Sequence, residues 1–252
     1  MNIYKDIKTV FNQGSIDYLE DDVHWGDDSD IVYEYGKTLE SKLGRKINIF
    51  YGGVGPGHIL AKILSQKRYW NKFVAVDYSR NMLKLAENRL KRLSEIDREI
   101  NQTNLYKVDL LKLKEKYRSG IFDMVICFNN TLGNIVLPNE SNSIEESHEK
   151  AKKIVLENFK FILKNNGYLI ISVYNYENIS LDSGAYTKNL KIKEKISQQS
   201  FLLKYCKNGK GHNFFTHWFR QQEISDLVTR CGFEINDILY RRERMIIVAK
   251  KK

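Results

Sequence analysis

The stretch NIFYGGVGPGH (residues 48–58) decides the fold, because three glycines at alternate positions follow directly behind a short apolar run. The apolar side chains of residues 47–51 predict a buried strand, and residues 57–64 (GHILAKIL) carry apolar side chains at helical spacing. The glycines are therefore predicted to form the turn between a strand and a helix.

Such a turn brings bare backbone against a ligand, because Gly53, Gly55 and Gly57 have no Cβ that would keep the ligand away. The N–H groups at the start of the following helix favour negative or carboxylate-like partners. The dinucleotide pattern G-x-G-x-x-G would need a glycine where this chain has His58. The turn alone is therefore a weak signal of function.

The composition predicts one domain, spanning residues 1–252, with enough hydrophobic residues (42%) to fill a core. We expect a cytoplasmic protein without a membrane span, because the chain has no apolar run of about 18 residues and a charged start. Cys127, Cys206 and Cys231 are widely spaced, which argues against a disulfide framework or a zinc site and predicts free thiols.

The net charge of +10 raises the alternative of a nucleic-acid partner. The basic residues are spread along the chain and interleaved with acids, as in KLKEKYR (residues 112–118), which is typical of a solvated surface. No nucleic-acid-binding motif is present, so a lysine-rich surface is the favoured interpretation.

Strands and helices alternate after the glycine turn, and the strands are apolar on both faces. This pattern predicts an α/β fold with a doubly wound, mostly parallel sheet. The C-terminal part predicts a helix followed by two strands close enough to pair antiparallel. The predicted strands after the turn are residues 72–77, 104–109, 122–128, 167–175, 233–241 and 244–250, and the predicted helices are residues 79–93, 144–163 and 221–231.

Two segments rich in tyrosine and polar residues fall outside this alternation, residues 1–45 and residues 175–213. Ligands of open α/β sheets bind at the carboxyl ends of the strands, so extra segments there would cover the site. We predict an N-terminal cap or lid and a substrate-covering insertion.

Two acids close successive predicted strands at this edge. Asp77 follows Gly57 by 20 residues, the place of a ribose-binding acid, and Asp109 ends the next strand, where it can meet an adenine amino group. Either acid alone could instead cap a helix or turn. Together with the glycine turn, they indicate a nucleoside ligand with a compact polar appendage.

The sequence at this point resembles the class I S-adenosylmethionine-dependent methyltransferases, from about residue 22 to the C-terminus. The motifs that carry the resemblance are YGGVGPGH, VAVDYSRNMLKLA, KVDLL, FDMVICFNNTLGNI, LKNNGYLIISVYNYENI and WFRQQEISDLVTRCGFE. Within that class, the chain looks most like the glycine and sarcosine N-methyltransferases, which act on small molecules. The resemblance implies a seven-stranded Rossmann-like methyltransferase fold and S-adenosylmethionine as cofactor.

The resemblance also implies site residues. The glycines would approach the methionine portion, Asp77 would hold the ribose, and residues 129–131 would face both cofactor and acceptor. Trp25 matches an aromatic residue that glycine-type enzymes place over the cofactor, although packing of the N-terminal arm explains it equally well. The implied cofactor-binding residues are Trp25, Tyr51, Gly53, Gly55, Gly57, His58, Asp77, Tyr78, Met82, Asp109, Leu110, Asn129 and Asn130.

Two departures from the family pattern concern both ends of the site. Tyr51 stands where the family usually has an acid that helps to organise the methionine end of the cofactor. Tyr174, just before Asn175 and Tyr176, stands where glycine-type enzymes have the arginine that clamps the substrate carboxylate. Glycine itself is therefore not expected to be the substrate.

Transfer to a neutral amine depends mainly on position and a dry pocket, whereas an oxygen acceptor needs a base. Asn130 is the favoured catalytic candidate, as an amide that orients the acceptor, with Tyr176 and His217 beside it. Other bases in principle are His24, Tyr33, Tyr174 and Tyr186. The sequence predicts N-methylation of a small molecule, with an RNA methyltransferase and a non-catalytic cofactor-binding module as alternatives.

Overall fold

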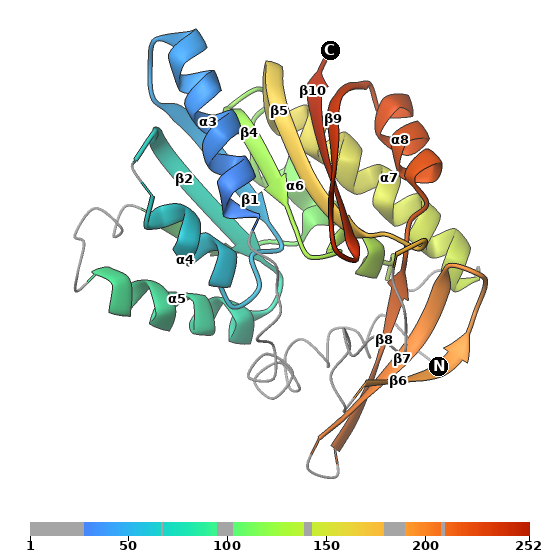
Figure 1. Cartoon of the computed structure of the whole chain (residues 1–252). Helices are drawn as coiled ribbons and strands as arrows, with labels where there is room; N and C mark the ends of the chain where they lie inside the picture. Colours follow the sequence, from blue (N-terminus) through green and yellow to red (C-terminus); the bar gives the residue numbers. More distant parts are fainter. Residues whose placement is uncertain (1–27, 67, 95–102, 139–142, 179–189, 208–209) are drawn as a thin grey trace.

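The computed structural model describes residues 28–66, 68–94, 103–138, 143–178, 190–207 and 210–252 (Figure 1). The predicted site residue Trp25 and the candidate bases His24 and Tyr186 lie outside these ranges. The main sheet consists of β1 (Ile47–Gly52), β2 (Trp70–Asp77), β3 (Thr103–Lys107), β4 (Phe122–Cys127), β5 (Leu163–Tyr174), β9 (Phe233–Arg241) and β10 (Arg244–Lys251).

The strand order of this sheet is β3-β2-β1-β4-β5-β10-β9. Neighbouring strands from β3 to β5 are parallel, and β10 runs antiparallel to both β5 and β9. The order reverses at β1, so the carboxyl ends of β1 and β4 form the switch point where ligands bind in such sheets. The predicted seven-stranded, mostly parallel sheet with an antiparallel C-terminal hairpin is confirmed.

Helices cover both faces of the sheet (Figure 1). One layer contains α3, α4 and α5, and the other contains α6, α7 and α8. Short 3-10 turns at Leu110–Lys112 and Leu132–Asn134 follow β3 and β4. The helix bounds are α3 (Ser29–Leu43), α4 (His58–Leu64), α5 (Arg80–Ser94), α6 (Leu113–Lys116), α7 (Ile144–Ile162) and α8 (Gln221–Arg230).

Each face of the sheet has its own hydrophobic core, because successive side chains of a strand point to opposite faces. In β1, Phe50 packs near Phe159 of α7, whereas Tyr51 lies in the other core with its ring 5.8 Å from that of Phe128. Strands buried on both sides read as continuous apolar runs, which is why the sequence predicted them.

Helix α3 lies within the predicted cap of residues 1–45. Its side chains Ile31 and Val32 are buried in the same core as β1 and α4. The described part of this segment therefore contributes a layer of the fold, and residues 1–27 lie outside the described ranges.

A second sheet forms in the predicted insertion and its continuation. Strands β6 (Leu190–Lys195), β7 (Ser200–Lys207) and β8 (Lys210–His217) pair antiparallel in the order β6-β7-β8. Figure 1 shows this sheet below the main one, on the side to which the parallel strands point their carboxyl ends. The insertion therefore lies on the side of the switch point.

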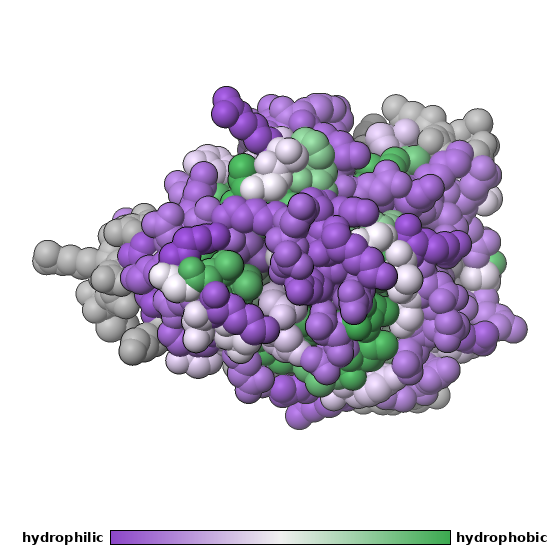
Figure 2. All heavy atoms as spheres, turned by 90° about the horizontal axis from the view of Figure 1, so that it is seen from above, coloured by the Kyte–Doolittle hydropathy of each residue, from purple (hydrophilic) through white to green (hydrophobic). Residues whose placement is uncertain are grey.

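The surface seen from the top of Figure 1 is largely hydrophilic, with hydrophobic residues in small separate areas (Figure 2). This agrees with the interpretation of the scattered lysines as solvated surface. In the described ranges, the helices are too short or too polar to cross a bilayer.

The close approach of α4 and α5 depends on Gly57. A Cβ at Gly57, whose φ is +79°, would lie 2.9 Å from the Cβ of Ala86, whereas a Cβ at Gly44, with φ +62°, would meet nothing within 4 Å. We expect Gly44→Ala to lower the free energy of unfolding by about 1 kcal/mol through backbone strain. Gly57→Ala should lower it by roughly 2–4 kcal/mol because steric overlap is added. Equal losses in urea unfolding of the two variants would contradict this packing role.

Candidate active site at the carboxyl edge of the sheet

The glycine turn has the predicted geometry, and its three glycines serve different purposes. Gly53, Gly55 and Gly57 all have left-handed backbones, with φ of +71°, +55° and +79°. A Cβ at Gly53 would lie 2.5 Å from Thr131 Cγ2, so this glycine and Gly57 are required by packing. A Cβ at Gly55 would meet nothing within 4 Å, which leaves Gly55 as the glycine that is open to a ligand.

Asp77 lies against this turn at the end of β2, as predicted. Its Oδ2 accepts from the backbone N–H of Gly55 (2.9 Å) and its Oδ1 from that of Ser79 (2.9 Å), while the side chain is only 7% exposed. Burial raises the pKa of Asp77 to about 6, against the lowering effect of these backbone hydrogen bonds. The carboxylate is therefore ionised at neutral pH and fixed beside the open glycine.

Two of the implied adenine-side residues follow Asp77, Tyr78 directly after the strand and Met82 in the first turn of α5. Ser79 Oγ accepts from the N–H of Met82 (3.2 Å), which confirms the predicted cap of α5. Met82 is buried and Tyr78 is half-buried.

Asp109 and Leu110 lie after β3. The Asp109 side chain accepts from the N–H of Leu111 (3.0 Å) and so caps the 3-10 turn. Capping a turn is the alternative role that the sequence left open for this acid. Leu110 is buried, and a Cβ on Gly52 would lie 2.8 Å from its Cδ2. Leu110 therefore supports the end of β1 as well as the region beyond β3.

The end of β4 has an unusual backbone. Asn129 and Asn130 are two consecutive non-glycine residues with positive φ, +55° and +56°. Both backbone N–H groups donate to Ser172 of β5. That of Asn129 donates to the Ser172 hydroxyl, and that of Asn130 donates to the Ser172 carbonyl. Backbone held in this region is costly and clusters at functional sites.

The Asn130 side chain is completely buried and joins three segments. Its Nδ2 donates to Thr216 Oγ1 and to the carbonyl of His217, both at 3.1 Å, and its Oδ1 accepts from the N–H of Tyr174. This amide therefore fixes β8 against the ends of β4 and β5. Asn129 Oδ1 is buried and has no hydrogen-bond partner within the described ranges.

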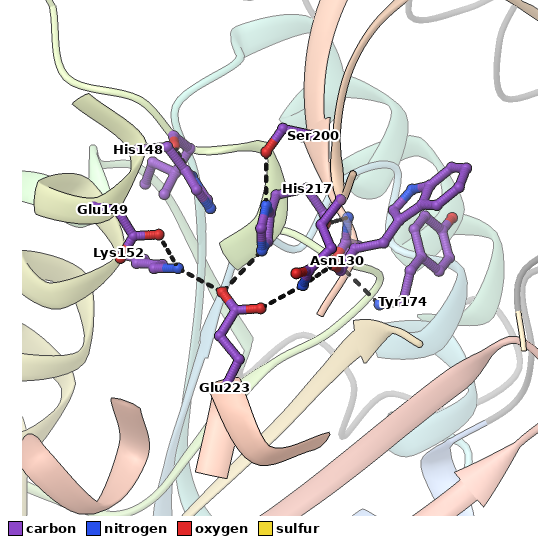
Figure 3. A network of polar contacts seen from close by, with 11 residues as sticks. Asn130, His148, Glu149, Lys152, Tyr174, Ser200, His217 and Glu223 are labelled. Atoms are coloured by element: carbon purple, nitrogen blue, oxygen red, sulfur yellow. Dashed lines mark hydrogen bonds and ion pairs between the residues drawn. The ribbon is translucent and has the colours of Figure 1, made fainter. Parts of the chain in front are cut away.

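His217 belongs to a buried polar network (Figure 3). Its Nε2–H donates to Glu223 Oε1 (2.9 Å), and its Nδ1 lies 2.9 Å from Ser200 Oγ. Lys152 of α7, 1% exposed, contacts the same Glu223 oxygen at 2.9 Å. Both ring nitrogens of His217 thus already have protein partners.

The charged form of Glu223 is stabilised within this network. Burial alone would raise the pKa of Glu223, but the hydrogen bond from His217 and the charge of Lys152 lower it to about 2. His148, whose ring lies 5.0 Å from that of His217, donates from Nδ1 to the carbonyl of Ile135 (2.7 Å). Burial, followed by the charges of His217 and Lys152, holds the pKa of His148 well below its usual value.

The remaining predicted residues lie around this edge. Tyr176 is half-buried, with the Arg220 guanidinium 5.2 Å from its ring centre. Tyr51 is 2% exposed, and burial raises the pKa of its phenol well above the usual value. His58 is half-buried, and burial with the charges of Arg89 and Lys62 lowers its pKa to about 4.

Sequence reasoning missed two ion pairs at this side of the molecule, each with a buried cation. One joins Lys152 to Glu223, and the other joins Asp28 to Arg244 of β10. A signal for Lys152 was present, since it falls on the apolar stripe of its helix. Asp28 and Arg244 are 216 residues apart and share no local pattern.

Comparison with known proteins agrees with this geometry. A family model described as a methyltransferase domain matches residues 52–232. The chain belongs to this family. It is an S-adenosylmethionine-dependent methyltransferase of class I, as the resemblance implied. A search of curated protein sequences gives no match.

Solved methyltransferase structures share the fold. An S-adenosylmethionine-dependent methyltransferase from Clostridium acetobutylicum is 16% identical, with a TM-score of 0.62 and 99% of each chain covered. The 1,6-didemethyltoxoflavin-N1-methyltransferase of Burkholderia thailandensis, solved with 1,6-didemethyltoxoflavin and S-adenosylhomocysteine, is 16% identical, with a TM-score of 0.61 and coverage of 99% of this chain and 88% of that one. Magnesium protoporphyrin IX methyltransferase from Synechocystis, with bound cofactor, is 14% identical, with a TM-score of 0.56 and coverage of 100% and 98%.

The residues at the switch point of this methyltransferase fit S-adenosylmethionine. Gly55 leaves space for close approach to the backbone, and Asp77 offers carboxylate lone pairs beside it. The buried Oδ1 of Asn129 is a further acceptor without a partner within the described ranges. These groups suit a ligand that carries hydroxyl and ammonium donors.

A matched pair of glycine variants tests the cofactor site. Gly55→Ala and Gly44→Ala introduce the same left-handed strain in open surroundings. We expect Gly55→Ala to weaken binding of S-adenosylhomocysteine at least roughly tenfold, because its methyl group occupies the ligand's side of the turn. Gly44→Ala should bind as the unmodified protein does. Equal affinity of both variants in calorimetry would contradict the role of Gly55.

The buried His148 predicts a pH dependence of stability. Below pH 6.5 the unfolded chain takes up a proton at this residue that the folded protein does not accept, so the free energy of unfolding falls as the pH falls. Between pH 7.5 and 5.5, the decrease in the free energy of unfolding should be about 1.4 kcal/mol greater for the unmodified protein than for His148→Gln. Urea unfolding at both pH values measures the difference, and parallel profiles would contradict it.

Proposed function

We propose that this methyltransferase acts on a small molecule and that an amine nitrogen is its preferred acceptor. The observation that carries the proposal is that the polar side chains at the acceptor edge already have hydrogen-bond partners within the protein. Both nitrogens of His217 and both ends of the Asn130 amide are hydrogen-bonded within the protein. An oxygen acceptor needs a base to remove its proton, whereas a neutral amine does not.

On the cofactor side, the proposed roles follow the predicted residues. When bound, S-adenosylmethionine would supply a methyl group on a sulfonium; the acceptor would take this methyl group in line, and S-adenosylhomocysteine would leave. Asp77 is proposed to hold the ribose, Gly55 to admit the methionine portion and Asp109 to meet the adenine. The rest of the cofactor site would be lined by Tyr51, His58, Tyr78, Met82, Leu110 and Asn129.

On the acceptor side, Asn130 and His217 are proposed as positioning residues and Tyr176 as part of the pocket wall. A hydrophobic cluster of the second sheet gathers beside them. It includes Phe201 and Trp218, whose ring centres are 4.3 Å apart, and Tyr174 and Tyr176 pack against it. An aromatic wall under a covering segment supports a compact acceptor held away from water, where alignment alone can account for roughly 7–11 kcal/mol of the barrier.

The proposed substrate differs from that of the glycine-type enzymes. Tyr174 stands where those enzymes carry the carboxylate-binding arginine, which argues against glycine itself. The N1-methyltransferase from Burkholderia acts, by its name, on a nitrogen atom of a small compound, which supports the same substrate class here. We also propose cytoplasmic residence, since Cys127 and Cys231 are free and buried.

Two alternatives make different predictions. The net charge of +10 favours an RNA methyltransferase, which would bind RNA in a salt-sensitive manner. Tyr51, in place of the usual acid, favours a module that binds the cofactor without turnover. Calorimetric titration with S-adenosylmethionine and S-adenosylhomocysteine, followed by a methyl-transfer screen over amines, phenols and RNA, separates the three. Turnover on RNA alone, or binding without turnover on any acceptor, would contradict the proposal.

Two buried aspartates at opposite ends of the strands give a matched test of the cofactor site. We expect Asp77→Asn to weaken S-adenosylhomocysteine binding by roughly 10- to 100-fold, because a charge-assisted acceptor is lost beside the glycine turn. Asp123, the second residue of β4, accepts from Arg45 and Lys164 and is the control. Asp123→Asn should lower thermal stability and leave affinity unchanged. Unchanged affinity in Asp77→Asn would show that the ribose assignment is wrong.

A further inference from the structure

A buried ion pair at the start of α3 has no role in the proposal above. Asp28 is completely buried, and its Oδ2 accepts from Nη1 of Arg244, which is 5% exposed. The second oxygen, Oδ1, is also buried and has no hydrogen-bond partner within the described ranges. One oxygen of this carboxylate therefore accepts no hydrogen bond from the described residues, which is costly in a protein interior.

The pair lies at the carboxyl edge of the main sheet. Arg244 begins β10 and stands opposite Tyr174, the last residue of β5. Two positions further along β10, Ile246 stands opposite Ser172, which holds the backbone of Asn129. Figure 1 shows α3 starting near the end of β1 from which the glycine turn leaves.

Tyr51 connects this pair to the glycine turn. It stands two residues before Gly53, where the resemblance implies an acid, and its buried phenol is neutral. The charges of Asp28, Asp77 and Arg244 all act on that phenol and influence its pKa. The two carboxylates and the guanidinium therefore lie within electrostatic reach of the place where the acid is missing.

We propose that Asp28 replaces this acid and binds the ammonium group of the cofactor's methionine portion through its unpartnered Oδ1. An ammonium brings hydrogen-bond donors to an oxygen that has none within the described residues, and Arg244 fixes the other oxygen. Although burial raises the pKa of Asp28 to about 6, against the lowering effect of Arg244, the carboxylate is ionised at neutral pH. Asp28 is thus a positioning residue for the methyl donor.

The inference rests on cofactor binding and not on the acceptor proposed above. Its test compares three ligands by calorimetry. S-adenosylhomocysteine carries the ammonium, its deaminated analogue keeps only the carboxylate, and 5′-methylthioadenosine lacks the whole amino-acid portion. The variants are Asp28→Asn and, as a matched control, Asp30→Asn, which removes a charge paired with Arg241 in the first turn of the same helix.

We expect Asp28→Asn to weaken the binding of S-adenosylhomocysteine by roughly 10- to 100-fold and to leave the affinity for the other two ligands unchanged. Asp30→Asn should change none of the three. An equal loss for all ligands, or no loss, would overturn the proposal and leave Asp28 as an anchor of α3. Equal affinity of the unmodified protein for S-adenosylhomocysteine and its deaminated analogue would also overturn it.

A second variant covers the case in which Asp28→Asn does not fold. Asp28→Glu keeps the charge but moves it by one methylene, so a selective loss of the ammonium-bearing ligand supports the proposal and a uniform change overturns it. Cofactor binding that follows this pattern without any turnover would refute the proposed acceptor and leave the role of Asp28 intact.

Discussion

The site depends on one buried carboxylate. Asp77 accepts from the N–H groups of Gly55 and Ser79, and so ties the glycine turn to the start of α5. Removing an ionised carboxylate from water costs several kcal/mol unless hydrogen bonds replace its hydration. The turn offers those bonds, and the carboxylate in turn fixes a backbone that three left-handed glycines would otherwise leave free.

This arrangement prepares the turn before a cofactor arrives. The N–H groups of Gly53 and Val54 donate to the carbonyl of Val76, so the backbone is already held from two directions. Ligand binding then loses little conformational entropy, which raises affinity without any additional contact. The same packing explains why, of the three glycines in this turn, only Gly55 faces open space.

The second sheet is attached by polar contacts as much as by its aromatic cluster. Lys152 is buried against Phe219, and Glu223 takes hydrogen bonds from both Lys152 and His217. The Lys152–Glu223 pair joins α7 to α8. A displaced sheet would remove the hydrogen bond from His217 to Glu223 and leave polar groups of this network without a partner, which is costly. These contacts therefore specify where β8 lies, and Asn130 extends that specification to the ends of β4 and β5.

Local patterns in the sequence predicted the main sheet, because strands buried on both faces are continuous apolar runs and the helices keep an apolar stripe. The second sheet was not predicted. Its edge strand reads LKIKEK, which has the composition of solvated surface and lacks the continuous apolar run that marks the strands of the main sheet. His217 was predicted as a base from its residue type, whereas its partners Ser200 and Glu223 become neighbours only in the folded chain.

The exchange of an acid for Tyr51 has a consequence for the whole N-terminal layer. An aromatic ring fills the core beside Phe128, but a neutral phenol cannot balance a cationic ligand group. If the balancing charge comes from Asp28, then the residue that precedes α3 both anchors that helix to β10 and recognises the cofactor. Loss of the Asp28–Arg244 pair would leave a guanidinium buried without its partner, so helix anchoring and cofactor recognition are stabilised by the same interaction.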